Sequence, residues 1–420
     1  MKKIICLLLS VLMSMALLSA CNSRSNKIVI WAYDTYAVAA EEAVKLYKQD
    51  HKDVEFDIIE LSQDDLVEKF RIALGSGNKA NLPDIIFEED YNAIGYFKYY
   101  EDCFVDISDY INADDFVEYK INNVTYHGKI YGIPYDSNAT PLFYRIDLIK
   151  QAGYSEADMD DLTWEEFIEI GKTVKQKTGV SMITICPEGN IEGRVIFQSS
   201  GRWYYDMQGN LDISNNKGLT HMMLTMKELY DANIAYRAAS WDDIISSIYN
   251  GKTASVTGGV FWGPIIAANP DQFNLWRVAK IPKMSGDESF SHYSMCGGGA
   301  VYALNTAKKD KTIDFICNTF GKSTELANIM IEKTQIVPVL KSAFHVPNAQ
   351  KGDAYFGGQN ICEVIAEWGV HTNPVFYGEF PYEITYKHGE LMADYLSGSK
   401  TLDQVISELQ EYAENLQATA

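Results

Sequence analysis

Strand and helix patterns alternate in the first part of the chain, and this order limits the fold more than any other feature of the sequence. Residues 27–31 and 82–87 form short apolar runs typical of buried strands. Between them, Val54, Phe56 and Ile58 alternate with acidic residues, which predicts a further strand. Two segments with apolar residues at three- and four-residue spacing separate these strands and predict helices. Strand, helix, strand, helix and strand in this order predict a parallel sheet flanked by helices.

Similar signals return in the later part of the chain. Thr163 and Glu166 have the spacing of a capping box, which predicts the beginning of a helix. Residues 181–186 and 254–257 are strand candidates, and a helix between Ser240 and Gly251 precedes the second of them. A chain of 420 residues exceeds the usual domain size of about 150 residues. We therefore expect two α/β lobes, and ligands in such folds bind at strand ends and between domains.

The first 21 residues have the features of a bacterial lipoprotein signal. Lys2 and Lys3 precede an apolar run, and the sequence 18–21, Leu-Ser-Ala-Cys, ends it with small residues before a cysteine. This pattern resembles a lipobox, in which the cysteine becomes the lipid-bearing N-terminus. We expect a signal peptide at residues 1–20, lipidation of Cys21, a tether at 21–26, and attachment to the extracytoplasmic face of the cell membrane. An ordinary cleaved signal or a short membrane anchor is the alternative.

Charge and cysteine spacing exclude several other functions. The formal net charge is −21 and there is no cluster of Lys and Arg, which argues against a nucleic-acid partner. The cysteines have no CxxC or Cys/His ligand spacing, so we expect no metal site. The segment Gly251–Thr253 lacks the earlier glycine of a phosphate-binding loop, and no dinucleotide fingerprint is complete. We therefore expect no cofactor.

Short segments in a fixed order carry a family resemblance that spans nearly all of the chain after the signal. They resemble the extracellular solute-binding proteins, family 1, that deliver carbohydrates to ABC importers and include maltose-binding protein. The segments are Pro83–Phe87, Tyr131–Tyr135, Phe143–Arg145, Ala152–Gly153, Thr163–Phe167, Asn250–Ser255 and Gly297–Gly299.

The resemblance implies a two-lobe, type II periplasmic-binding-protein-like α/β fold. Each lobe would be a mixed sheet flanked by helices, with the ligand cleft between the lobes. We expect the N-lobe at residues 27–134 and 296–336, and the C-lobe at 135–295 and 337–420.

The implied function is non-catalytic. The resemblance implies a monomer that captures a carbohydrate, preferably an oligosaccharide, by hinge closure and presents it to the permease subunits of an ABC transporter. A glycoside hydrolase remains an alternative, because paired carboxylates beside aromatic rings also describe its active site. A binder of a polyol or another non-sugar solute is a further alternative.

A sugar offers apolar C–H faces and a rim of hydroxyl groups, so its site needs aromatic rings and planar polar side chains. The resemblance places such residues after the first and third strands, at the first hinge, in the loop before residue 195, in the Gly-rich segment at 258–262 and before the C-terminal helices. Asn138 stands where maltose-binding protein has a ligand-binding carboxylate. The predicted contacts are Trp31, Tyr33, Asp34, Tyr36, Glu89, Asp90, Tyr91, Asp136, Asn138, Arg194, Phe261, Trp262, Glu379 and Tyr382.

The sequence leaves the identity of the sugar open. The 27 tyrosines and 7 tryptophans favour an extended oligosaccharide, which offers more face for stacking than a monosaccharide does. Asn373-Pro374 and the glycine-rich hinge faintly resemble arabino-oligosaccharide-binding lipoproteins. Xylo-, malto- and other plant-glycan fragments remain alternatives.

Overall fold

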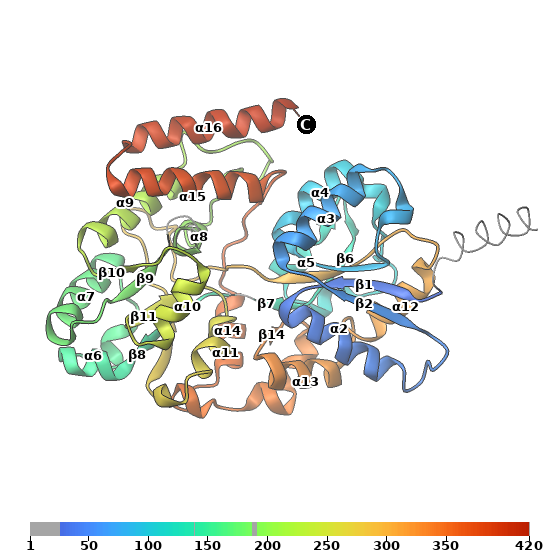
Figure 1. The fold of residues 1–420 in the computed structure, drawn as a ribbon, viewed down its shortest axis with the longest axis horizontal. Helices are drawn as coiled ribbons and strands as arrows, with labels where there is room; N and C mark the ends of the chain where they lie inside the picture. The colour runs from blue at the N-terminus through green and yellow to red at the C-terminus, as the bar shows by residue number, and fades with distance from the viewer. Residues whose placement is uncertain (1–25, 138, 187–190, 420) are drawn as a thin grey trace, which may run out of the picture.

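Two α/β lobes lie side by side, with short crossing segments between them (Figure 1). The structure is a computed structural model that describes residues 26–137, 139–186 and 191–419. The predicted signal peptide, Cys21 and Asn138 lie outside the described residues. No helix among the residues that are described is long and apolar enough to cross a bilayer.

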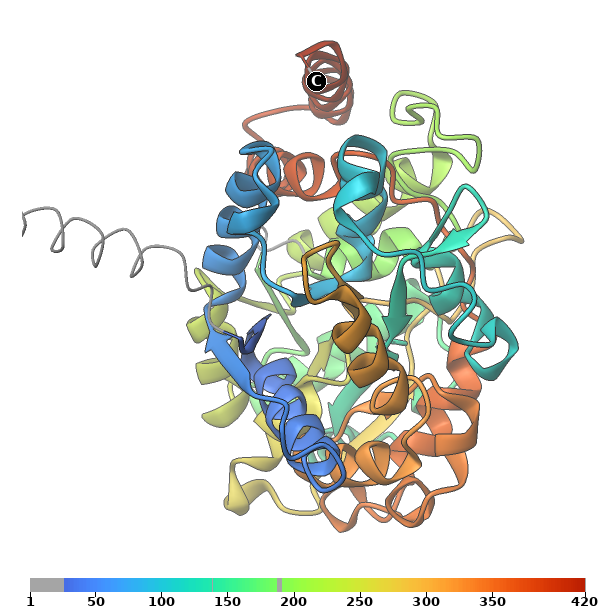
Figure 2. The same cartoon turned by 90° about the vertical axis from the view of Figure 1, so that its right-hand side faces the viewer.

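The N-lobe contains a five-stranded mixed sheet in the order β2-β1-β3-β13-β6. β1 pairs in parallel with β2 and β3, whereas β13 pairs antiparallel with both β3 and β6. The parallel half is the predicted strand–helix alternation, and β13 arrives from a distant part of the chain. Figure 2, seen from the N-lobe side, shows α2 and α12 in front. The elements are β1 (Ile28–Ala32), α2 (Asp34–Tyr47), β2 (Phe56–Glu60), α3 (Gln63–Gly75), β3 (Ile85–Glu89), α4 (Ala93–Tyr100), α5 (Glu118–Asn123), β6 (Gly132–Pro134), β13 (Gly299–Ala303), α12 (Lys309–Asn318) and α13 (Thr324–Thr334).

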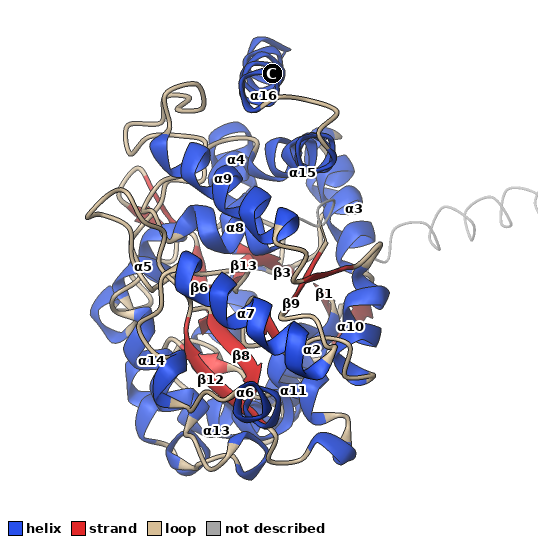
Figure 3. Ribbon diagram, turned by 90° about the vertical axis from the view of Figure 1, so that its left-hand side faces the viewer, coloured by secondary structure: helices blue, strands red, loops and turns tan. Residues whose placement is uncertain are grey.

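The C-lobe is built on a three-stranded antiparallel sheet, β11-β8-β12, and a parallel pair, β10-β9. α6 and α7 lie on the side of this lobe away from the N-lobe (Figures 1 and 3). The elements are β8 (Pro141–Arg145), α6 (Ile146–Ala152), α7 (Trp164–Thr178), β9 (Ile183–Ile185), α8 (Ile191–Gln198), α9 (Lys217–Asp231), β10 (Ala235–Arg237), α10 (Trp241–Tyr249), β11 (Ser255–Thr257), α11 (Trp262–Ala267), β12 (Trp276–Lys280), α14 (Ile361–Gly369), α15 (Pro381–Ser397) and α16 (Leu402–Thr419).

The lobes are joined by short antiparallel contacts between their crossing segments. β7 (Asp136–Ser137) pairs with β14 (Val337–Pro338), and Ala139 forms an isolated bridge with Met295. β7 and β14 lie between the lobes in Figure 1. Short ladders of this kind hold few hydrogen bonds, which suits segments that must bend when lobes move.

Buried apolar side chains form one large core in each lobe. The first core draws on residues 28–135 and 295–349, and the second on residues 142–290 and 375–413. Tyr91 is an exception, because it follows an N-lobe strand and packs in the second core. A side chain that reaches from one lobe into the core of the other couples the positions of the two lobes.

Local capping signals explain where several helices begin. Thr163 and Glu166 form the predicted reciprocal capping box at the start of α7. Thr401 and Gln404 form the same pair of hydrogen bonds before α16. The third predicted strand is shifted, since β3 extends through Glu89. Pairing of Gly299 with Glu89 extends it, and a partner so distant in sequence leaves no local signal.

Candidate ligand-binding site between the lobes

A buried ion pair lies at the carboxyl end of β3. Asp90, in the short 3₁₀ helix η2 (Asp90–Asn92), lies 2.5 Å from Nζ of Lys120 in α5, and both side chains are fully buried. Asn123 donates a hydrogen bond to Asp90 at 3.2 Å. Because buried charged groups are costly unless they are paired, Lys120 and Asp90 hold each other at fixed positions.

Asp136 of β7 lies beside this pair at the hinge. It accepts hydrogen bonds from the Tyr36 hydroxyl at 3.2 Å and from the Gly299 N–H at 2.8 Å. Burial raises the pKa of Asp136, and the nearby charge of Lys120 opposes that rise. Tyr36 stacks on Phe87 with ring centroids 5.6 Å apart. Asp136 therefore connects the first strand–helix unit of the N-lobe with the hinge.

Arg194 and Tyr91 meet across the two lobes. The guanidinium of Arg194, on α8 of the C-lobe, lies 4.8 Å from the centroid of the Tyr91 ring. Tyr91 also packs edge-on against Tyr377 at 5.7 Å, and Tyr377 accepts a hydrogen bond from Gln198 at 3.4 Å. The result is a buried layer of aromatic and planar polar groups between the lobes, the combination that a sugar ring and its hydroxyl groups require.

Two glutamates at the end of β3 have perturbed acidity. Burial, with the neighbouring charge of Glu89, raises the pKa of Glu88 to about 7. Burial also raises the pKa of Glu89, and the charge of Arg194 opposes this effect. Asn92 donates to Glu88 at 3.3 Å. A carboxyl group whose pKa lies near 7 can donate or accept a hydrogen bond, so Glu88 can match either role of a hydroxyl group.

Several buried polar atoms in this layer have no hydrogen-bond partner among the described residues. They are Oδ1 of Asp90, Nε of Arg194, Oε1 of Gln198 and Nε1 of Trp203. More than nine in ten buried polar groups are normally paired, and an unpaired one costs about 1 to 3 kcal/mol. Donors and acceptors gathered in one buried layer therefore mark a place where a polar ligand would supply the missing partners.

The other residues predicted after the first strand have different environments. Trp31 is buried, with Lys69 Nζ 4.3 Å from its ring centroid. Tyr33 is buried and packs edge-on against Tyr36 at 4.9 Å. Asp34 is exposed at the first position of α2, with a φ of 43°. Tyr36, in contrast, donates a hydrogen bond to Asp136 and so belongs to the candidate site.

Glu379 and Tyr382 lie at the rim, where they bind side chains of the N-lobe. Glu379 forms an ion pair with Lys98 and accepts a hydrogen bond from Tyr99 at 2.8 Å. Tyr382 donates to Asp64 at 3.3 Å. In this arrangement both residues connect α15 and the loop before it to α3 and α4, and they act as a latch between the lobes.

Phe261 immediately precedes α11, and Trp262 is the first residue of that helix. Trp262 is fully buried, and its indole N–H donates to the Thr257 carbonyl at 3.3 Å. Trp241 of α10 covers it, with ring centroids 4.7 Å apart. Trp241 is 43% exposed, so the outer ring of this stack belongs to a residue that the sequence did not indicate.

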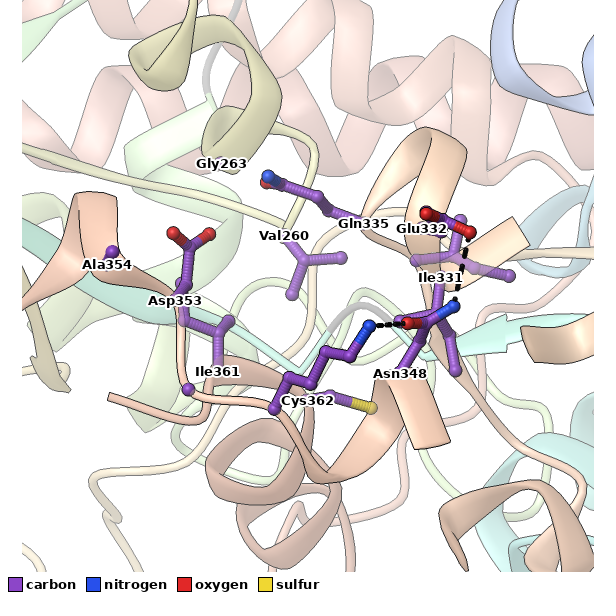
Figure 4. Close-up of a pocket in the computed structure, with 13 residues that line it drawn as sticks. Val260, Gly263, Ile331, Glu332, Gln335, Asn348, Asp353, Ala354, Ile361 and Cys362 are labelled. Atoms are coloured by element: carbon purple, nitrogen blue, oxygen red, sulfur yellow. Dashed lines mark hydrogen bonds between the residues drawn. The ribbon is translucent and has the colours of Figure 1, made fainter. Parts of the chain in front are cut away.

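A cavity of about 260 Å³ lies elsewhere, beside α11, α13 and α14 (Figure 4). Val260, Gln335, Asp353 and Cys362 are among its lining residues, and the predicted contact residues are not. It is separate from the buried polar layer described above.

Sequence reasoning missed Lys120, Gln198 and Trp241. A lysine between Tyr119 and Ile121 is a weak signal of a buried ion pair, whereas Gln198 and Trp241 have no distinguishing local pattern. Among the described residues, no group of three or more His, Cys, Asp or Glu side chains is placed to hold a metal ion.

Comparisons with known proteins identify the family and the fold. The sequence model of the family described as bacterial extracellular solute-binding protein matches residues 42–356. The lactose-binding protein of Rhizobium radiobacter is 34% identical over 372 residues, which cover 88% of each chain. Among solved structures, the GacH receptor of Streptomyces glaucescens has a TM-score of 0.77 at 16% identity, covering 93% of this chain and 98% of that one. The sugar-binding protein MalE of Xanthomonas citri also has a TM-score of 0.77, at 17% identity, covering 94% and 98%.

Proposed function

Because the chain belongs to the bacterial extracellular solute-binding proteins, we propose that it captures a carbohydrate between its lobes and delivers it to the permease of an ABC importer. Members of this family are extracytoplasmic binding proteins, not enzymes. The observation that supports a sugar ligand most strongly is the buried layer of Asp90, Tyr91, Arg194 and Tyr377. It combines aromatic rings with polar atoms that have no hydrogen-bond partner in the described part of the chain.

Capture would use the contacts that cross between the lobes. When the lobes separate, Arg194 leaves Tyr91, and the latch residues Glu379 and Tyr382 leave α4 and α3. A ligand that binds both lobes at once favours the closed state by its difference in affinity for the two states. The permease would then recognise the surface that only the closed state presents.

We propose a β-galactoside disaccharide such as lactose as the first ligand to test. The relative of 34% identity is a lactose-binding protein, and the alignment covers 88% of both chains. A preference for neutral sugars follows from the charges at the site. Glu88, Glu89, Asp90 and Asp136 contribute carboxyl groups, against the two cations Lys120 and Arg194. Uronic acids would meet like charge in this layer and bind more weakly.

We also propose that residues 1–20 are removed and that Cys21 carries a lipid that holds a monomeric receptor at the outer face of the cell membrane. The lysines and apolar run before Cys21 support this arrangement. A tether raises the effective concentration of the receptor near its permease without any new contact. Replacement of Cys21 by serine should release the protein from the membrane fraction.

Thermal-shift measurements on the purified protein against a glycan panel test the proposed function. A ligand at a hundred times its dissociation constant stabilises the folded state by about 2.7 kcal/mol, which raises the melting temperature by several degrees. Lactose, arabino-, xylo- and malto-oligosaccharides belong in the panel, with a polyol and a uronic acid as comparisons. If only the polyol raises the melting temperature, the ligand class is wrong.

A further inference from the structure

Arg71, on α3 of the N-lobe, forms an ion pair with the C-lobe. Its Nη1 lies 2.8 Å from Oε1 of Glu383 on α15, and its guanidinium carbon lies 5.2 Å from the centroid of the Tyr382 ring. In Figure 1, the end of α15 nearest the N-lobe lies beside α3. The other carboxylate oxygen of Glu383 is buried and has no hydrogen-bond partner among the described residues. The charge of Glu383 is therefore compensated by a residue of the opposite lobe.

The same guanidinium group also reaches the buried part of the N-lobe. Arg71 donates to the hydroxyl group of Tyr96 on α4, and that hydroxyl group donates to Oε2 of Glu88 at 3.4 Å. Tyr96 and Glu88 are both buried. Burial raises the pKa of Glu88 to about 7, and the charge of Arg71 opposes this rise. Arg71 and Tyr96 thus connect Glu383 at the rim with Glu88 in the buried polar layer.

The groups around Glu88 make it sensitive to the position of Arg71. Asn92 and the Glu89 N–H donate to its carboxylate at 3.3 and 2.8 Å. The titratable groups that face Glu88 are Glu89 on β3, Arg71 on α3, Tyr96 on α4, Tyr33 after β1, Tyr91 in η2 and Tyr302 on β13. Arg71 is the cation of this set, so its environment determines how much positive charge stabilises the ionised form of Glu88.

We propose that Arg71 is a positioning residue that couples closure of the lobes to protonation of Glu88. This inference rests on the proposed sugar-binding function and adds the uptake of a proton to it. In the closed state Glu383 offsets the charge of Arg71. In the open state Glu383 moves away with α15, and the full charge of Arg71 acts on a carboxylate that water can reach.

Closure therefore raises the proton affinity of Glu88, because the closed layer excludes water and supplies less positive charge. A group whose pKa is higher in the closed state favours closure at low pH, and this contribution is lost as pH rises through the closed-state value of about 7. Sugar binding takes up a proton from the solvent, and sugar affinity falls with rising pH.

Calorimetric titration of the intact protein with lactose, or with the glycan that raises the melting temperature most, tests the coupling. Titrations at pH 7 in two buffers of different ionisation enthalpy count the protons taken up, and we expect about half a proton per sugar. Affinity should fall about five- to tenfold between pH 6 and pH 8. These measurements need no substitution, so they do not depend on the folding of a variant.

Two substitutions that break the same ion pair should shift the pH profile in opposite directions. Arg71→Met removes the cation near Glu88, so the midpoint of the profile should move upward by about 0.5 to 1 pH unit. Glu383→Gln keeps this cation and leaves its whole charge to act on Glu88, so the midpoint should move downward. A contact that only holds the lobes together would instead give a similar loss of affinity at every pH in both variants. In a Glu88→Gln background, neither substitution should move the midpoint.

Lys48→Met is the matched control. The side chain of Lys48 is 35% exposed, as is that of Arg71, and it pairs with Glu55 within the N-lobe. This variant should keep the affinity and the pH profile of the wild type. No proton uptake by the wild type, or a midpoint that moves in the same direction or not at all in Arg71→Met and Glu383→Gln, would overturn the coupling while the proposed function stands. If no glycan of the panel binds at any pH, the proposed function fails and the coupling fails with it.

Discussion

Arg194 lies over the ring of Tyr91, with 4.8 Å between the guanidinium carbon and the ring centroid, although the two residues belong to different lobes. Arg194 comes from α8 of the C-lobe and Tyr91 from the short helix that follows β3 of the N-lobe. Tyr91 is buried and Arg194 is half-buried, and the buried Nε of Arg194 has no partner among the described residues. This contact therefore connects the two lobes, and the Nε–H of Arg194 remains available to donate to a ligand.

The substitution Gly95→Ala tests closure of the two lobes without changing any residue of the buried polar layer. Gly95 lies within α4, and a Cβ there would overlap the backbone oxygen of Glu379 in the opposite lobe. Gly95→Ala should therefore weaken sugar affinity more than tenfold, because one added methyl group prevents the lobes from meeting. Alanine favours the helix by about 1 kcal/mol, so the melting temperature without ligand should not fall.

Gly75→Ala is the control for Gly95→Ala. A Cβ at Gly75 would meet Tyr100 at 3.8 Å, an ordinary van der Waals contact within the N-lobe. Calorimetric titration of both variants is the measurement. Equal affinities in Gly95→Ala and Gly75→Ala would show that the contact between α4 and Glu379 has no role in ligand capture.

Lys120 should stabilise the folded state by pairing with the buried Asp90. Lys120→Met leaves the Asp90 carboxylate buried without its cation, and removal of one partner of a buried pair costs about 3 to 5 kcal/mol. The double variant Lys120→Met/Asp90→Asn removes both charges and should recover a large part of this loss. Urea unfolding of the two single variants and the double variant gives the coupling. Strict additivity of the two single effects would contradict the pairing.

Glu192 should make stability depend on pH. Burial raises the pKa of Glu192 to about 7, above the usual 4.5, so between these values the folded state binds more protons than the unfolded state. The free energy of unfolding therefore falls as pH rises through this window, by about 3 kcal/mol for this one group. Glu88 contributes in the same direction.

Glu192→Gln removes that dependence while keeping the shape of the side chain. The variant should be more stable than the wild type at pH 8 and about equally stable at pH 5, which thermal melting at both values would show. Glu68→Gln, at an exposed position of α3, is the control. A wild type whose melting temperature rises from pH 5 to pH 8, with no gain in Glu192→Gln, would refute the assignment.

The rim latch should contribute to affinity in a salt-dependent way. Glu379→Gln weakens the contacts with Lys98 and Tyr99 that form only when the lobes meet. A pair at the surface contributes about 0.2 to 1 kcal/mol, so sugar affinity should fall by up to about fivefold. The difference from wild type should shrink at high salt. Glu169→Gln, which removes the Lys172 partner within α7, should not change affinity at any salt concentration.

Local signals predicted the parts of the fold that local chemistry determines. The capping box at Thr163 forms as expected, and the strand–helix alternation becomes the parallel part of the N-lobe sheet. The extension of β3 through Glu89 was not predictable, because its partner Gly299 is about two hundred residues away. Pairing between distant segments leaves no periodic pattern in either of them.

The candidate site was predictable as a set of loops but not as a set of contacts. Asp90, Tyr91, Asp136 and Arg194 do come together in one buried layer. The contacts between side chains depend on how the lobes and helices pack. The stacking of the exposed Trp241 on the buried Trp262 therefore had no signal in the sequence.

Calorimetric titration of lactose into the wild-type protein and into Arg194→Met tests the central claim most directly. We expect saturable binding of one sugar per chain to the wild type. The affinity of Arg194→Met should be at least about tenfold lower, because methionine keeps much of the volume and removes the charge-assisted hydrogen bonds. No saturable heat with lactose or any other glycan of the panel, or unchanged affinity in Arg194→Met, would contradict capture of a sugar between the lobes.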